Sequence, residues 1–189
     1  MKTNEISKLT LAGMFAALAF ICFAYLRIEI PMGGGMTGKI YIGHAFIILA
    51  AVILGSKYGA LTGAVGLSLA DFLAGYTTSA PPTFLAKFLL GYAAAFSART
   101  IFNLPNAGPQ KQLAIIAVSG VFACIVNVIT EPLIRYAFKF YILGMPQELA
   151  YLSAVNCAVS MAVSAVPSVI LAVLLYKALY KNVFKNYQF

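Results

Sequence analysis

The chain has 189 residues, of which 62% are apolar and only 10% are charged, and its formal net charge is +8. Its mean hydropathy is +0.91. A soluble fold of this size cannot hide so much apolar surface from water, so the composition excludes a soluble globular enzyme, a nucleic-acid-binding domain and a disordered chain. It predicts a helical protein that crosses a membrane several times.

Six apolar segments are predicted to be transmembrane helices, because a helix needs about 20 mainly apolar residues to cross a bilayer. The second and third are short for a full span, and we expect them to be tilted or partly re-entrant. In chain order the predicted helices cover residues 9–26, 40–54, 60–75, 83–97, 113–141 and 151–176, the last with one or two further turns to residue 181. The predicted fold class is an all-α membrane protein with six transmembrane helices, and residues 1–189 are predicted to form a single domain.

The basic residues predict how these helices are oriented. Six spans place both termini on one side of the membrane, and that side carries eight Lys or Arg residues against five on the other. Because basic residues concentrate in cytoplasmic loops, both termini are predicted to be cytoplasmic. The outward side then holds three connecting segments, namely the glycine-rich residues 27–40, the proline-containing residues 76–82, and residues 142–150.

Three ionisable residues lie inside apolar segments near their outward ends: His44, Asp71 and Lys87. Such residues are costly at membrane depth and are functional by default. One interpretation is structural, with an Asp71–Lys87 ion pair and an interhelical hydrogen bond for His44. The other is a cavity in which these groups contact a polar ligand, and the sequence leaves both open.

A second polar group lies on the fifth predicted helix, where Asn127, Glu131 and Arg135 recur every four residues and therefore share one face. At membrane depth that face must point into the bundle rather than toward lipid. A Glu131–Arg135 pair that fixes helix packing is the structural alternative. Asn156, near the outward end of the sixth helix, adds an amide that both donates and accepts. Together these residues predict one polar pocket beneath the outward loops.

Small residues recur four apart in the first helix, as Ala12-x-x-x-Ala16 and Gly13-x-x-x-Ala17. This spacing lets another helix approach closely. The neighbouring helix belongs either to this chain or to a partner protein, and the sequence does not decide between them.

The chain lacks the motifs of several kinds of chemistry. It has no phosphate-binding G-x-x-x-x-G-K-[ST], no G-x-S-x-G and no H-E-x-x-H. Cys22, Cys124 and Cys157 lie in apolar segments without metal-ligand spacing. We therefore expect no enzyme activity, no metal site and no ATP hydrolysis by the chain itself.

Several longer sequence blocks carry a family resemblance: GKIYIGH at 38–44, LGSKYGA at 54–60, LADFLAGY at 69–76, and Thr83 followed by KFLLG at 87–91. With Ala12-x-x-x-Ala16, which matches the AxxxA motif of the family's first helix, they resemble the substrate-binding S components of energy-coupling factor (ECF) vitamin transporters. Within that family the chain is similar to the riboflavin-type or HmpT-like subgroup. The resemblance spans nearly the whole chain.

The resemblance implies a multi-pass protein of the bacterial cytoplasmic membrane that captures a vitamin or precursor in an outward cavity. It implies three partner subunits, a transmembrane coupling protein and two cytoplasmic ATPases. Their ATP hydrolysis would make the S component topple and release its ligand inside, so the chain needs no cofactor of its own. The docking face would hold Ala12, Gly13, Ala16 and Ala17. Loops around residues 33–39, 76–82 and 144–148 would close the cavity.

The predicted substrate-binding residues combine polar, charged and aromatic side chains: Lys39, Tyr41, His44, Asp71, Tyr76, Thr83, Lys87, Asn127, Glu131 and Asn156. A near-neutral pocket of this kind suits a small polar heteroaromatic ring, on which Tyr41, Phe72 and Tyr76 would stack. The first expectation for the cargo is hydroxymethylpyrimidine or pyridoxine, with riboflavin and pantothenate as alternatives in the same family.

Two other classes of function remain for comparison. A free-standing proton-coupled transporter would use Asp71, Glu131 and His44 as a proton relay. Uptake by the chain alone, abolished by collapsing the proton gradient, would distinguish it from an S component. An integral membrane enzyme is disfavoured, because the sequence shows no metal cluster or nucleophile arrangement.

Overall fold

The computed structural model describes residues 5–32 and 36–182, without the side chains of residues 109–110 and 180–182. The glycines at 33–35 of the predicted outward loop lie outside the described residues, as do Lys2 and Lys185 among the basic residues used to predict orientation.

Six α-helices and one β-hairpin account for most of the described chain. The helices are α1 (Glu5–Tyr25), α2 (His44–Leu54), α3 (Ser56–Leu73), α4 (Ala80–Phe96), α5 (Pro109–Ala137) and α6 (Gln147–Asn182). The strands are β1 (Ile28–Pro31) and β2 (Thr37–Ile40). Short 3₁₀ or π segments are η2 (Thr77–Ser79), η3 (Ser97–Ile101), η4 (Leu104–Asn106) and η5 (Phe138–Ile142). Each predicted helical segment coincides with a helix of the structure, with ends that differ by a few residues.

The hairpin is the main departure from the predicted elements. β1 pairs with β2 in antiparallel register, with Ile28 opposite Ile40 and Pro31 opposite Thr37. The sequence interpretation of a loop followed by helix from residue 40 is therefore wrong here, because four-residue strands are too short to leave a clear alternating pattern. A Cβ built on Gly38 would lie 2.6 Å from Ser160 Oγ, so the hairpin backbone packs directly on α6.

α2 is short and lies inside the bundle. Its eleven residues are all buried except Phe46, and it contacts α1, α3, α4 and α6. Gly55 connects α2 to α3 without a loop. Its φ of +95° is a backbone conformation that favours glycine. Carbonyl groups at a helix end need partners, and Arg99 Nε donates to Val52 O at 3.2 Å. The Arg99 guanidinium also bonds Ile53 O, which completes this end of the helix.

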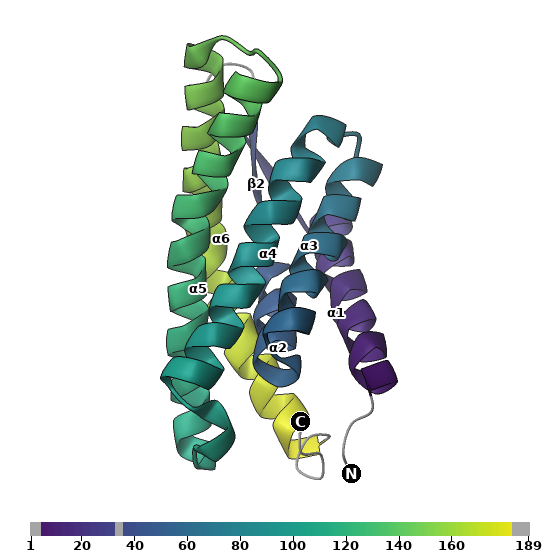
Figure 1. The fold of residues 1–189 in the computed structure, drawn as a ribbon, viewed down its shortest axis with the longest axis vertical. Helices are drawn as coiled ribbons and strands as arrows, with labels where there is room; N and C mark the ends of the chain where they lie inside the picture. Colours follow the sequence, from purple (N-terminus) through teal and green to yellow (C-terminus); the bar gives the residue numbers. More distant parts are fainter. Residues whose placement is uncertain (1–4, 33–35, 183–189) are drawn as a thin grey trace.

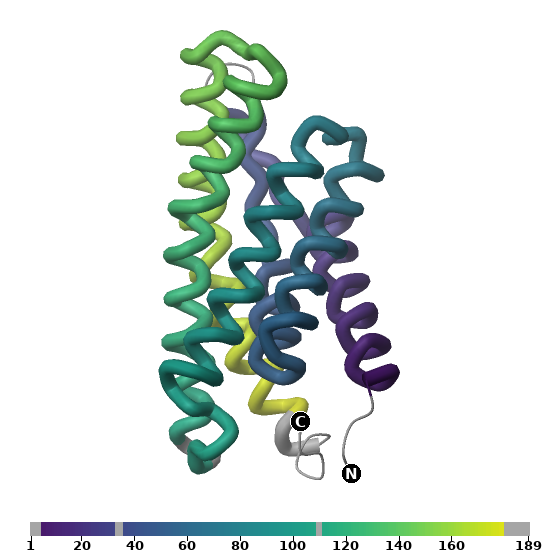
Figure 2. The backbone as a smooth tube through the Cα atoms, viewed as in Figure 1, coloured from purple at the N-terminus to yellow at the C-terminus, as the bar shows by residue number. Residues whose placement is uncertain are grey.

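The other helices surround α2 in a bundle that Figures 1 and 2 show from one side. α3 packs between α1 and α4, α4 packs on α5, and α5 packs on α6. The beginning of α1 and the end of α6 lie at one end of the bundle. The α3–α4 and α5–α6 connections lie at the other end, toward which the hairpin also extends (Figure 1). The chain ends and these two connections thus lie at opposite ends of the long axis; the end with the two connections is called the connection end below.

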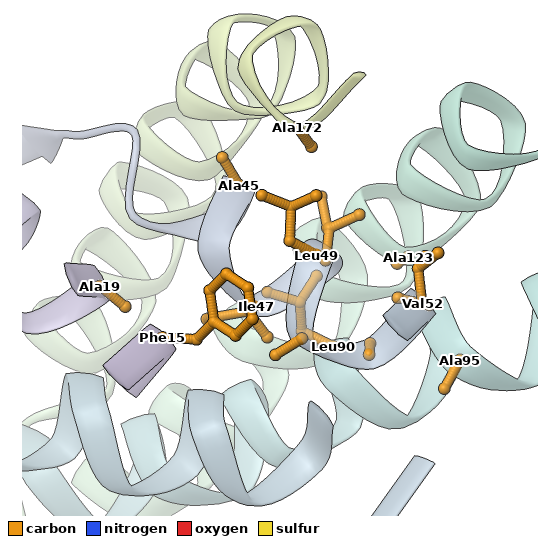
Figure 3. Close-up of a cluster of buried hydrophobic side chains, with 14 of the residues drawn as sticks. Phe15, Ala19, Ala45, Ile47, Leu49, Val52, Leu90, Ala95, Ala123 and Ala172 are labelled. Atoms are coloured by element: carbon orange, nitrogen blue, oxygen red, sulfur yellow. The ribbon is translucent and has the colours of Figure 1, made fainter. Parts of the chain in front are cut away.

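Apolar side chains from five helices gather around α2. Figure 3 shows Phe15 of α1 and Leu90 of α4 close to Ile47, Leu49 and Val52 of α2. Ala45, Leu49 and Ile47 are fully buried, as is Leu90. This cluster fills the half of the bundle that holds the chain ends.

The outer surface is apolar as well. Large side chains on several helices are exposed, among them Leu18, Val65, Phe84, Ile125 and Val163. Four helical segments are long and apolar enough to cross a membrane: Glu5–Tyr25, Thr77–Ile101, Lys111–Ile142 and Gln147–Leu179. The prediction of a mostly helical membrane protein is confirmed.

Glycine allows α3 and α4 to approach each other closely. A Cβ built on Gly91 would lie 2.8 Å from Ala60 Cα and in contact with Gly59 O. Backbone atoms cannot move aside as the end of a side chain can, so the crossing requires the absence of a Cβ.

We expect Gly91→Ala to lower stability by about 1–3 kcal/mol, the usual cost of inserting a methyl group into a packed interface. The measurement is the thermal unfolding midpoint in detergent. Gly13→Ala is the matched control, because a Cβ on Gly13 has nothing within 4 Å. Equal midpoints for both variants would show that the α3–α4 crossing is not tightly packed.

Candidate functional site

A polar cavity of about 320 Å³ lies between the hairpin and the ends of α3, α4, α5 and α6. Small-molecule sites in proteins span roughly 300–1,000 Å³, so this one suits a compact ligand. Its lining residues are Phe23, Met36, Thr37, Gly38, Lys39, Tyr41, Asp71, Tyr76, Ser79, Thr83, Glu131, Arg135, Lys139, Ser153, Asn156, Cys157, Ser160 and Met161.

Aromatic side chains form the wall next to the hairpin. The rings of Phe23 and Tyr41 meet edge to face, with centroids 5.0 Å apart. Lys39 Nζ lies 2.9 Å from the centroid of the Tyr76 ring, a cation–π contact. The Tyr76 hydroxyl donates to Glu29 Oε1 at 3.4 Å, which ties this ring to β1. The wall offers flat apolar surfaces within reach of a polar ligand.

Lys39 links the hairpin to α3. Its Nζ lies 3.8 Å from Asp71 Oδ1, an ion pair between β2 and the end of α3. Burial lowers the pKa of Lys39 to about 8, and the Asp71 carboxylate opposes part of that shift.

Arg135 forms the opposite wall and is held by three helical segments. Its Nη1 donates to Ser79 Oγ at 3.1 Å, and its Nη2 donates to Glu131 Oε1 at 3.2 Å and to Thr83 Oγ1 at 3.4 Å. The Thr83 hydroxyl in turn donates to Asp71 Oδ2 at 2.6 Å. The guanidinium orientation is thus fixed by partners on η2, α4 and α5.

Beneath the cavity lies a buried network centred on Lys87, whose side chain is fully buried. Its ammonium pairs with Glu131 Oε2 and lies 2.9 Å from His44 Nε2 and 3.4 Å from Asn127 Oδ1. His44 Nε2 also lies 3.2 Å from the Tyr41 hydroxyl. The network joins α2, α4 and α5 and forms the floor of the cavity.

The wall on α6 is a stripe of small polar residues. Ser153, Asn156, Cys157 and Ser160 all line the cavity. Their spacing of three or four residues places them on one face of the helix. Lys139 Nζ donates to Ser153 Oγ at 2.7 Å and so extends the polar surface from η5 onto α6.

The structure brings together most of the predicted substrate-binding residues. Seven of them line the cavity: Lys39, Tyr41, Asp71, Tyr76, Thr83, Glu131 and Asn156. The other three, His44, Lys87 and Asn127, lie in the network below it.

Two interpretations of individual residues are corrected. Lys87 pairs with Glu131 on α5, and Asp71 pairs with Lys39, so the suggested Asp71–Lys87 pair is wrong. Phe72, proposed as a stacking ring, is 57% exposed on the outer surface of α3 and does not line the cavity. The suggested Glu131–Arg135 pair is confirmed.

Several lining residues were not selected from the sequence. Lys139 continues the four-residue series of Asn127, Glu131 and Arg135, and that series was the available signal. The α6 serines could be found in the same way, as polar residues at helical spacing in an apolar segment. Of the three predicted capping segments, residues 36–39 and Tyr76 with Ser79 line the cavity, whereas residues 144–148 do not.

The small residues of α1 divide between two faces. Ala12 is buried, and its carbonyl accepts from Thr62 Oγ1 at 3.3 Å. A Cβ built on Gly66 would lie 2.7 Å from Ala16 O, so Ala12 and Ala16 both face α3. Gly13 and Ala17 are exposed on the outside of the bundle.

Comparison with known proteins identifies the family. A family model for the S component of ECF-type riboflavin transporters matches residues 3–181. ThiT from Listeria monocytogenes has a similar structure, with a TM-score of 0.66 at 17% sequence identity over 97% of this chain and 98% of that chain. The S component of a bacterial ECF transporter is also similar in structure, with a TM-score of 0.65 at 19% sequence identity over 96% of this chain and 99% of that chain. No curated protein matches the chain.

The two structural likenesses show a shared fold, and the family model extends over nearly all of the sequence. S components are subunits of transporters and not a family of enzymes. The chain belongs to the ECF-type riboflavin transporter S component family.

Proposed function

We propose that this protein captures a water-soluble vitamin or vitamin precursor in the cavity above Lys87 and delivers it across the membrane. The observation that carries the proposal is a polar cavity of about 320 Å³, lined by aromatic and charged side chains, in an otherwise apolar bundle. Its position near the connection end suits a site that opens to one side of the membrane.

The cargo proposed first is hydroxymethylpyrimidine or pyridoxine. Phe23, Tyr41 and Tyr76 offer surfaces for a flat heteroaromatic ring, and Asn156 offers an amide for its polar edge. The family name is not carried over to the cargo. Riboflavin and pantothenate remain the alternatives.

We propose that the chain forms a single domain in a bacterial cytoplasmic membrane, with its six helices embedded in the bilayer and α2 too short to cross it. Both termini would be cytoplasmic, since the side predicted to hold the chain ends carries eight Lys or Arg residues against five on the other. The cavity, at the opposite end, would then open outward.

Transport would depend on an ECF module of a transmembrane coupling subunit and two ATPase subunits. The proposed docking surface is on α1, where Gly13 and Ala17 leave a shallow exposed strip next to the inward-facing Ala12 and Ala16. ATP hydrolysis by the module would topple this subunit and release the ligand inside, so this chain needs no cofactor.

We expect Asn156→Ala to weaken ligand binding by about 1–3 kcal/mol, the cost of losing a buried polar contact. The measurement is calorimetric titration of the purified protein in detergent with pyridoxine, hydroxymethylpyrimidine, riboflavin and pantothenate. Val155→Ala is the matched control, because Val155 is exposed on the outside of α6. Unchanged affinity in Asn156→Ala would remove this residue from the site.

Docking is tested separately from binding. We expect the double variant Gly13→Leu, Ala17→Leu to lose vitamin uptake in cells that express the ECF module, while the purified variant binds ligand like the wild type. Bulky side chains would block close helix approach without entering the α1–α3 interface. Normal uptake by the variant would contradict the docking surface. Uptake without the module, abolished by collapsing the proton gradient, would instead favour a free-standing transporter.

A further inference from the structure

The charged residues around the cavity do not balance. Four described cations line it or lie in its floor, namely Lys39, Lys87, Arg135 and Lys139, whereas the described acids there are Asp71 and Glu131. These six described groups therefore carry a net formal charge of +2. Charges in a low-dielectric interior are costly unless they are compensated. The pocket was expected from the sequence to be near-neutral, and the described lining and floor residues correct that expectation.

The excess positive charge lies at the α5 side of the cavity. Asp71 pairs with Lys39, and Glu131 is shared between Lys87 and Arg135. No carboxylate of the described residues lies within 4.0 Å of Lys139 Nζ, whose hydrogen bond goes to the neutral Ser153 hydroxyl. Lys139 lies in the π-helical segment η5, and such segments occur frequently at functional sites.

Arg135 adds an unused donor at the same place. Its two terminal nitrogens are held by Ser79, Thr83 and Glu131, but Nε is buried and has no hydrogen-bond acceptor in the described chain. A buried N–H group without an acceptor is costly, and such groups are rare in folded proteins. A guanidinium matches the geometry of carboxylate and phosphate oxygens.

We propose that the ligand carries an oxyanion, a carboxylate or a phosphate ester, which binds between Arg135 and Lys139. Ser153 orients the Lys139 ammonium, and the aromatic wall takes the rest of the ligand. This assignment rests on the proposed capture of a vitamin or precursor, and it favours pantothenate or a phosphorylated vitamer over the neutral hydroxymethylpyrimidine and pyridoxine. Among related vitamers the site selects an acid or a phosphorylated form over its neutral alcohol.

The test compares matched ligand pairs that differ in one anionic group: pantothenate with pantothenol, and pyridoxine 5′-phosphate with pyridoxine. Calorimetric titration in detergent should give at least tenfold tighter binding for the anionic member of a pair. The carboxylate and phosphate pairs distinguish the two sources of the oxyanion. Inorganic phosphate alone serves as a further probe for protection against thermal unfolding.

Lys139→Gln keeps a donor for Ser153 but removes the positive charge. It should weaken binding of the anionic ligand at least tenfold and leave binding of the neutral member unchanged. Lys57→Gln is the matched control, because Lys57 is exposed on α3 and does not line the cavity. The melting midpoint of each variant shows whether it is folded.

Several results would overturn the inference. One is that a neutral ligand binds as tightly as its anionic partner. Another is that Lys139→Gln weakens binding of the neutral and the anionic ligand equally. Either would leave the proposed function intact. If neither pair binds, mass spectrometry of compounds extracted from the purified protein decides. If the wild-type protein carries an acidic compound that Lys139→Gln lacks, the inference is supported. If it carries a neutral compound, the inference is overturned and the proposed function is not. If no compound is bound to the purified protein, both the inference and the proposed function are overturned.

Discussion

The Lys87 ammonium is fully buried in an apolar bundle, and its neutralisation constrains the rest of the structure. A lone charge at this depth would cost several kcal/mol, so partners must converge on it from the surrounding helices. Glu131 and Asn127 come from α5, His44 from α2 and Met161 from α6. Four helices are thereby held at one point, which separates the packed apolar half of the bundle from the polar half.

The same interaction determines the character of the cavity. Glu131 has one oxygen directed to Lys87 and the other to Arg135, so a single carboxylate connects the floor to the wall. Arg135 is then fixed in position by Ser79 and Thr83. A site whose groups are held by further hydrogen bonds needs little rearrangement when a ligand binds. Because the acid is shared between two cations, positive charge remains available at the cavity surface.

Simple constraints on the sequence predicted the helical segments, and seven of the ten predicted binding residues line the cavity. Asp71, Lys87 and Glu131 were recognisable because an ionisable residue in an apolar helix must face the interior. Their pairing was not predictable, because it depends on the rotation of α3, α4 and α5 about their axes. The hairpin was missed because its strands have only four residues each. Lys139 was missed although the spacing that revealed Arg135 continues to it.

The length of α2 has a consequence for where empty space arises in the molecule. Eleven helical residues extend only about 16 Å, roughly half of a hydrocarbon core of about 30 Å. The hairpin lies along the remaining half of this central column (Figure 1), and its residues line the cavity. A helix two or three turns longer would fill that column with backbone. The space for the cavity therefore arises from the early end of one helix, and the residues that replace the missing turns determine the size and charge of that space.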